Sequence, residues 1–269
     1  MKRLKKILRG LVKAFFPEGI KCNCCGDELP REMKYSFCGK CFGKLIFCGD
    51  SICKKCGSYT EDLSDFCQTC KRAERPFDMG RGVLYYTGDA ARLIKAYKSG
   101  DKFLAPYFAE MMYDHYAANL SNERLDAVCF VPCGRKRLKE RGYNQSAELA
   151  RLFCEKAELP LYDCLRQIKP TRKQATLSAA ERAENIQGAY AVCCRTGYCR
   201  TDSKVAEDRK AAESKADADH DCFDVKGKRI MLIDDIFTTG CTAGECARVL
   251  KKAGANYVLV FTLATGKGK

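Results

Sequence analysis

The sequence predicts an α/β protein in which helices flank a parallel sheet, with a small cysteine-rich region before the sheet. Two observations carry this prediction. From residue 82 onward, apolar runs that read as strands alternate with helical patterns. Before residue 71, eight of the ten cysteines fall into four Cys-x2-Cys pairs. Of the 269 residues, about 190 remain for one α/β domain, so we expect two domains.

Residues 1–17 are predicted to form a basic amphipathic helix. Six cations precede any acidic residue, and apolar side chains recur at helical spacing until Pro17 ends the pattern. Such a helix can dock its apolar face on its own domain, or it can lie on an anionic membrane surface. The first interpretation is favoured, and peripheral membrane contact stays open.

The four Cys-x2-Cys pairs, here called knuckles, predict metal sites within residues 18–75. Two knuckles together supply the four thiolates of a tetrahedral zinc site. The simplest pairing is consecutive and gives a double zinc ribbon with two structural zinc ions, but spacing alone leaves a crossed pairing open. The candidate ligands are Cys22, Cys25, Cys38, Cys41, Cys53, Cys56, Cys67 and Cys70. No signal peptide pattern precedes them, so we expect zinc in a reducing cytoplasm rather than disulfides.

The region that follows alternates between strands and helices. Apolar runs predict strands at residues 82–86 and 127–132, and helical spacing predicts helices at 90–98, 104–118 and 146–156. This alternation is typical of a parallel sheet covered by helices.

A cation-rich loop is expected directly after the strand at 127–132. Five cations lie within residues 135–141. Arginine presents forked donors that match phosphate oxygens, so Arg135, Arg137 and Arg141 are candidate ligands of a phosphate or pyrophosphate. A solvated loop without a ligand is the less favoured alternative.

Residues 230–242 are the most informative segment. They read as an apolar strand that ends in Asp234 and Asp235, followed by a threonine-rich turn and a helical pattern over 243–253. Ligands bind where a parallel strand leads into a helix, because N–H groups and the helix dipole there favour phosphate. The two carboxylates can accept hydrogen bonds from a vicinal diol, so the segment describes a cradle for ribose 5-phosphate. The candidate phosphate ligands are Thr238, Thr239, Gly240, Cys241 and Thr242.

The charge of the chain favours an anionic partner. The formal net charge is +14 at pH 7, which suits nucleic acid or a strongly anionic small substrate, although a merely soluble basic protein is also consistent with it. No apolar run reaches the length of about 18 residues that a membrane-spanning helix needs. Glycine patterns of nucleoside triphosphate and dinucleotide loops do not occur.

Residues 230–242 resemble the phosphoribosyl pyrophosphate (PRPP) motif of the type I phosphoribosyltransferases. Further matches in chain order sharpen the resemblance to the ComF family of bacterial proteins, over residues 11–264. These matches are Val131-Pro132, Arg135, Arg137, Arg141-Gly142-Tyr143-Asn144-Gln145, Arg166, Thr171, Gln174, Leu177, Glu181-Arg182, Asn185 and Gly188-Ala189-Tyr190. The resemblance implies a type I phosphoribosyltransferase-like sheet with an N-terminal double zinc ribbon.

For function, the resemblance implies PRPP binding with Mg²⁺ and a role in DNA uptake during natural transformation. Single-stranded DNA and other competence proteins would be partners. An active phosphoribosyltransferase, which moves phosphoribose from PRPP to an unidentified acceptor and releases pyrophosphate, is the alternative. In either case the turn at 238–242 would hold the 5-phosphate, Asp234 and Asp235 the ribose hydroxyls, and the three arginines the pyrophosphate.

One segment departs from the family pattern. Residues 193–223 form an insertion whose part at 200–221 is rich in charge and nearly without apolar side chains, so we expect a mobile surface excursion. The polar residues 172–182 are predicted to form a mobile cover over the site. The predicted domains are thus a helix at 1–17, the double zinc ribbon at 18–75 and the phosphoribosyltransferase-like domain at 76–269.

Overall fold

The computed structural model describes residues 21–30, 35–61, 64–171, 179–193 and 223–266. The chain divides into two compact units, residues 1–45 and 46–269. The first two knuckles belong to the first unit, and the last two belong to the second unit with the sheet. The helix predicted at 1–17, the interior of the insertion at 193–223 and most of the predicted cover lie outside the described residues.

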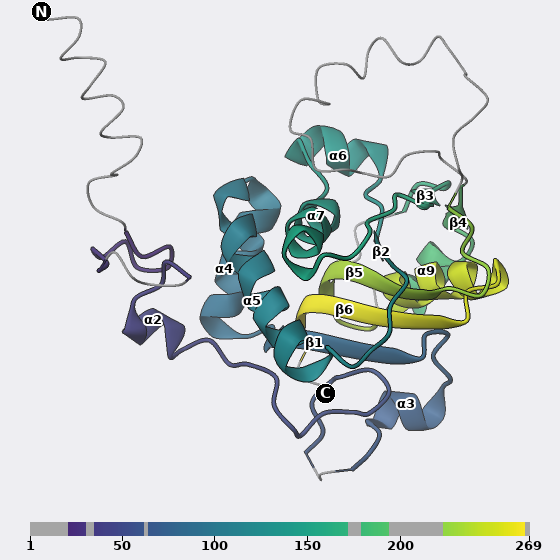
Figure 1. Ribbon diagram of the computed structural model, residues 1–269, viewed down its shortest axis with the longest axis horizontal. Helices are drawn as coiled ribbons and strands as arrows, with labels where there is room; N and C mark the ends of the chain where they lie inside the picture. Colours follow the sequence, from purple (N-terminus) through teal and green to yellow (C-terminus); the bar gives the residue numbers. More distant parts are fainter. Residues whose placement is uncertain (1–20, 31–34, 62–63, 172–178, 194–222, 267–269) are drawn as a thin grey trace, which may run out of the picture. The chain divides into compact units, whose positions relative to one another are not determined.

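The second unit is built on a parallel sheet with the strand order β1-β6-β5-β2 (Figure 1). Its strands are β1 (Met79–Tyr85), β2 (Ala127–Phe130), β5 (Arg229–Phe237) and β6 (Tyr257–Thr265). The two central strands pair along their whole length, from Arg229 opposite Tyr257 to Phe237 opposite Thr265. Strand β6 is buried from Val258 to its end, which is expected when helices cover both faces of a parallel sheet.

Alternate residues of the central strands face different helices. The helices of this unit are α3 (Gln68–Arg72), α4 (Gly88–Ser99), the 3-10 helix η1 (Lys102–Leu104), α5 (Ala105–Asn119), α6 (Arg135–Arg141), α7 (Gln145–Ala157), α8 (Ala179–Ile186) and α9 (Cys241–Lys252). Val260 of β6 packs in one apolar core with residues of α9. The next residue, Phe261, contacts the rings of His115 in α5 and Phe153 in α7. Both faces are therefore covered, with the period of two that strands impose.

A small antiparallel pair lies beside the main sheet. It consists of β3 (Leu165–Gln167) and β4 (Tyr190–Val192). None of the helices in the described part of the chain has the length and apolar character needed to cross a membrane.

The predicted α/β class is confirmed, and two local predictions are corrected. Strand β5 does not end at the carboxylate pair but runs on to Phe237, because β6 continues beside it and completes the ladder. The cation-rich segment is not a loop but helix α6. Arginine and lysine are good helix formers, and Gly142, with φ of 78°, ends the helix by donating its N–H to the Leu138 carbonyl oxygen.

Candidate functional site

Two groups of cysteines each bring four sulfur atoms together. They are Cys22, Cys25, Cys38 and Cys41 in the first unit, and Cys53, Cys56, Cys67 and Cys70 in the second. Within each group the sulfurs lie within 4.8 Å of one another. This arrangement pairs consecutive knuckles, so the crossed pairing does not occur. Four sulfurs at such separations suit a tetrahedral metal ion.

The two groups are built alike. Each first knuckle is a turn closed by a glycine N–H, from Gly26 to the Cys22 carbonyl oxygen and from Gly57 to the Cys53 carbonyl oxygen, both at 2.9 Å. Each second knuckle begins a short helix, α2 (Gly39–Phe42) or α3. Burial alone would raise the pKa of the first cysteines, but backbone N–H donors outweigh it and lower the pKa of Cys22 to about 6 and of Cys53 to about 7. At these two positions the thiolate, which binds metal, is favoured, whereas burial raises the pKa of Cys56 and Cys70 in the second group.

The second cysteine group is part of the core of the sheet unit. Cys53 and Cys56 are buried in the apolar core that α9 shares. Their turn lies directly against β1, since a Cβ atom on Gly57 would come within 2.5 Å of the Gly80 carbonyl oxygen. The Gly80 N–H also donates to the Lys55 carbonyl oxygen at 2.7 Å. Backbone therefore packs on backbone here, with no space for a side chain.

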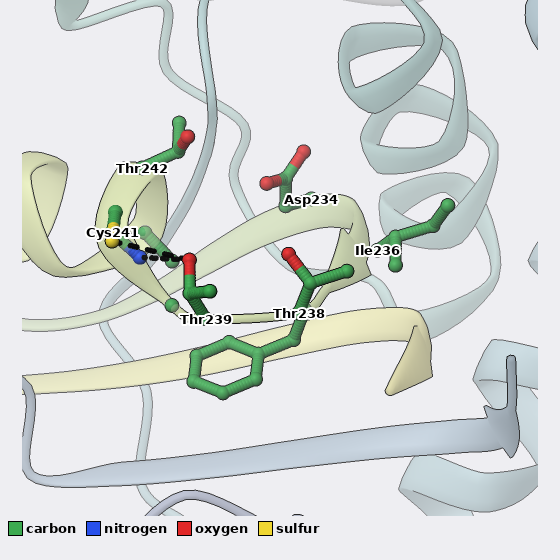
Figure 2. A pocket seen from close by; sticks show the side chains of 9 residues that line it. Asp234, Ile236, Thr238, Thr239, Cys241 and Thr242 are labelled. Carbon is green, nitrogen blue, oxygen red and sulfur yellow. Dashed lines mark hydrogen bonds between the residues drawn. The ribbon is translucent and has the colours of Figure 1, made fainter. Parts of the chain in front are cut away.

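A pocket opens where β5 leads into α9 (Figure 2). Its lining residues are Asp234, Ile236, Phe237, Thr238, Thr239, Gly240, Cys241, Thr242 and Ala243. All five predicted phosphate ligands thus lie at one pocket, together with one of the two carboxylates. Helix α9 begins at Cys241, so its first N–H groups have no partner within the helix and can serve an anion.

The turn requires glycine at position 240. Gly240 has φ of +75°, in the left-handed region, and a Cβ atom there would lie 2.4 Å from the Phe237 ring. Any other side chain would have to displace the ring and strain the backbone. Thr239 stabilises the same turn, since its hydroxyl donates to the Cys241 sulfur at 3.1 Å.

The two carboxylates have different partners. Asp234 accepts hydrogen bonds from the Ser146 hydroxyl at 2.8 Å and from the Asp235 N–H at 2.9 Å. Asp235 is buried and forms an ion pair with Lys98, Nζ to Oδ1, at 3.0 Å. Asn144 places Ser146, because its side-chain oxygen caps α7 and accepts the Ser146 N–H at 3.1 Å. Helices α4 and α7 therefore both reach the carboxylate pair.

The environment of Asp234 predicts a pH dependence of stability. Burial and the charge of Asp235 raise the pKa of Asp234 to about 7, while Lys98 and the Ser146 hydroxyl act against the rise. An aspartate whose pKa is higher in the folded than in the unfolded chain stabilises the fold at pH values below its unfolded pKa. This contribution is lost as the pH rises through the folded pKa. We expect the free energy of unfolding of the wild type, relative to Asp234→Asn, to fall between about pH 4 and pH 7. Urea unfolding of both proteins measures this; a difference independent of pH would contradict it.

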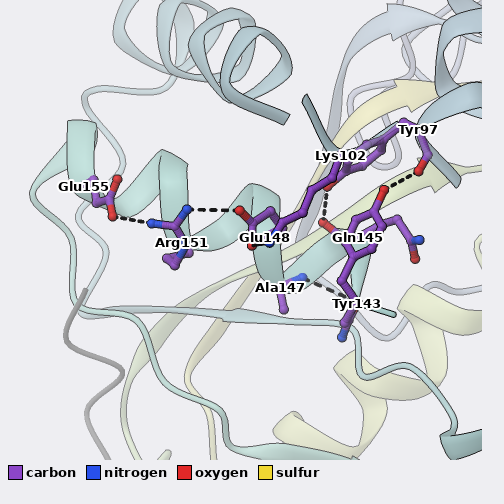
Figure 3. Close-up of polar contacts among 9 residues, drawn as sticks. Tyr97, Lys102, Tyr143, Gln145, Ala147, Glu148, Arg151 and Glu155 are labelled. Carbon is purple, nitrogen blue, oxygen red and sulfur yellow. Dashed lines mark hydrogen bonds and ion pairs between the residues drawn. The ribbon is translucent and has the colours of Figure 1, made fainter. Parts of the chain in front are cut away.

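Helix α4, which carries Lys98, is tied to the start of α7 (Figure 3). The Tyr97 hydroxyl donates to the Gln145 carbonyl oxygen at 2.9 Å, and the Tyr143 hydroxyl donates to the Tyr97 carbonyl oxygen. The Lys102 ammonium lies 5.7 Å from the centre of the Tyr143 ring. Because Tyr97 is buried and adjacent to Lys98, these contacts fix the place where Lys98 meets β5.

Two of the three predicted arginines are half-buried and have side-chain partners. Arg141 Nη1 donates to the Gln145 side-chain oxygen at 2.9 Å. Arg137 is held by the Thr171 hydroxyl, to which its Nη2 donates at 2.8 Å. Arg135 is exposed at the start of α6. The structure therefore separates Arg135 from the other two.

Arg75 reaches the pocket from the cysteine-rich side. Its Nη1 donates to the Thr239 carbonyl oxygen at 2.8 Å. Burial raises the pKa of the Cys70 thiol, and the Arg75 guanidinium acts against the rise. Sequence reasoning missed Arg75, Lys98 and Ser146. Only Ser146 had a signal, because it follows a helix-capping asparagine at a strand-to-helix connection.

Comparison with known proteins finds competence proteins among those similar to this chain. No protein-family model matches it. It is 25% identical over 248 residues to Competence protein F of Haemophilus influenzae, covering 90% of this chain and 95% of that protein. Competence protein ComFC of Streptococcus pneumoniae is 23% identical over 258 residues, covering 91% and 99%. The chain is similar to the ComF proteins over nearly its whole length.

The ComF resemblance predicted from the sequence is thereby confirmed. A further similar protein is DNA utilization protein YhgH of Salmonella typhimurium, 23% identical over 222 residues and covering 79% of this chain and 83% of that protein. Among solved structures, a glutamine PRPP amidotransferase from B. subtilis aligns with 65% of this chain and 27% of that chain, at 18% identity and a TM-score of 0.33. A likeness that low carries no functional argument.

Proposed function

We propose that this cytoplasmic protein binds PRPP or ribose 5-phosphate in the β5–α9 pocket and acts in DNA uptake. The pocket geometry supports the ligand, because a threonine-rich turn at a helix N-terminus adjoins a carboxylate pair on the preceding strand. A phosphate suits the turn, and a vicinal diol suits the carboxylate pair. The competence and DNA utilization proteins among the relatives support the cellular role.

Each part of the ligand has a candidate partner. Residues 238–242 hold the 5-phosphate, and Asp234 and Asp235 accept hydrogen bonds from the ribose hydroxyls. Arg137 and Arg141 meet the pyrophosphate, whose charge Mg²⁺ would neutralise. In the two cysteine groups we propose one structural zinc ion each, since four thiolates at these separations suit zinc.

Calorimetry with the purified full chain tests the ligand. PRPP and ribose 5-phosphate should both bind in the presence of Mg²⁺, while ribose alone should bind much more weakly because the phosphate contacts are lost. Equal affinity for ribose and ribose 5-phosphate would contradict a phosphate site in the pocket.

Helix α6 supports a single-stranded DNA surface. Arg135, Lys136 and Lys139 are exposed on it, and none of the ion pairs formed among the described residues uses a cation of this helix. Exposed cations attract the phosphates of single strands with little sequence preference.

Neutralising these three cations tests the DNA surface. The triple variant Arg135→Ala, Lys136→Ala, Lys139→Ala is expected to flatten the slope of log affinity against log salt by about two units, at about 0.7 per phosphate contact. Fluorescence anisotropy with a labelled oligonucleotide measures the slope. The control neutralises Lys226, Lys228 and Lys252, which are also exposed, and should leave it unchanged. Equal slopes in the α6 variant and the wild type would exclude α6 from the DNA surface.

Phosphoribosyl transfer is the alternative function. Arg137 and Arg141 favour it, because their helix α6 follows β2, the parallel neighbour of β5, and a departing pyrophosphate needs cations near the ribose site. Incubation with PRPP, Mg²⁺ and a panel of nucleobases, followed by measurement of pyrophosphate, tests it. Release that depends on one base would establish a transferase; binding without release would favour a ligand-binding role.

A further inference from the structure

A short segment joins the second cysteine group to the phosphate-binding turn. Cys70 lies in α3, and only residues 71–74 separate it from Arg75. Arg75 Nη1 donates to the Thr239 carbonyl oxygen at 2.8 Å. A single short segment therefore leads from a predicted zinc ligand to the phosphate-binding turn.

The bond to Thr239 sets the direction of the next N–H group. In a trans peptide the carbonyl and the following N–H point in opposite directions. Holding the Thr239 oxygen therefore directs the Gly240 N–H away from Arg75. Gly240 lines the pocket, and a phosphate there needs such donors.

Pro76 and Phe77, the two residues after Arg75, contact the elements on either side of the turn. The Phe77 ring meets the Phe237 ring edge-on, with centres 5.8 Å apart. A Cβ atom on Gly244, in the first turn of α9, would lie 3.6 Å from Pro76. Residues 75–77 thus contact the end of β5, the turn and the start of α9.

The Nε–H of Arg75 is buried and has no acceptor among the described residues. Metal in the second group would fix α3, which carries Cys70, and with it the start of the short segment that places Arg75. The metal would thereby hold the guanidinium in the position from which it reaches Thr239.

We propose that Arg75 is a positioning residue that couples the second cysteine group to the phosphate-binding turn. Metal bound by this group then sets the affinity of the turn for the 5-phosphate. The inference rests on the ribose 5-phosphate site proposed above. It assigns the second group a role that the first group, in a separate unit, does not share.

Replacing the guanidinium tests the coupling at the turn. Arg75→Gln is expected to weaken ribose 5-phosphate binding about tenfold in calorimetry, the effect of losing one charge-assisted hydrogen bond. The zinc content should stay unchanged, because no ligand is removed. Arg72→Gln, an exposed arginine at the end of α3, is the matched control and should bind as the wild type does.

Cobalt tests the link to the metal. Cobalt(II) replaces zinc in thiolate sites and absorbs visible light, and coupling between two sites is reciprocal. Adding ribose 5-phosphate to the cobalt-loaded full chain should change the cobalt–thiolate absorption of the wild type but not that of Arg75→Gln. An affinity of Arg75→Gln for ribose 5-phosphate equal to that of the wild type would overturn the proposal. So would a wild-type cobalt spectrum that does not change when ribose 5-phosphate is added. If the wild type does not bind ribose 5-phosphate, the proposed function itself fails.

Discussion

Asp234→Ala combined with Asp235→Ala is expected to lower the affinity for ribose 5-phosphate by about two decades or more. In the proposed complex each carboxylate accepts hydrogen bonds from ribose hydroxyls. Hydrogen bonds to charged groups contribute about 1.5–3 kcal/mol each, and about 1.4 kcal/mol corresponds to one decade. Calorimetry in the presence of Mg²⁺ measures the loss, with circular dichroism to show that the variant is folded.

Binding of inorganic phosphate distinguishes a loss of the diol contacts from a loss of the whole pocket. Phosphate should bind the double variant at least as well as the wild type, because the turn at 238–242 is kept and two negative charges beside it are removed. Asp89→Ala removes a surface carboxylate of α4 that pairs with Arg92, and it should leave both affinities unchanged. Wild-type affinity of the double variant for ribose 5-phosphate would show that the carboxylates do not hold the sugar.

Cys67→Ser combined with Cys70→Ser is expected to lower the unfolding temperature of the sheet unit by about 10 °C or more. Structural zinc binds zinc-finger peptides with about 10–16 kcal/mol of apparent free energy. Even part of that loss is large, since about 1 kcal/mol shifts the unfolding temperature of a domain this size by about 2–4 °C. The sheet is affected because Cys53 and Cys56 belong to its core, at 0% and 2% exposure.

The first cysteine group supplies the matched control. Cys22→Ser with Cys25→Ser also removes one predicted zinc ion, but its group lies in the other compact unit. Thermal unfolding followed by circular dichroism, with metal analysis, should show one zinc ion in each variant, against two in the wild type, and a large temperature shift only for the Cys67/Cys70 variant. Equal shifts would mean that the second group is not part of the sheet core.

Local signals predicted the parts of the site that are contiguous in the sequence. The apolar strand, the threonine turn and the helix after it follow one another along residues 230–253, so periodicity and turn chemistry were sufficient. The knuckles were predicted from spacing, because each Cys-x2-Cys pair is a single turn. Their pairing required the structure, since two knuckles meet only through the fold.

Contacts between distant segments could not be predicted. Lys98 reaches Asp235 from 137 residues earlier in the chain (235 − 98) because α4 packs beside α7. Arg75 reaches Thr239 across 164 residues. A single lysine or arginine on a helix or loop is usually solvated, so neither carries a local signal. The length of β5 was misjudged for the same reason, since its end is set by its partner strand.

A crystal structure of the full chain with ribose 5-phosphate tests the proposed site most directly. We expect the phosphate to accept N–H and hydroxyl bonds from residues 238–242, with the ribose hydroxyls on Asp234 and Asp235. A phosphate bound on α6, with the β5–α9 pocket empty, would contradict the proposed site.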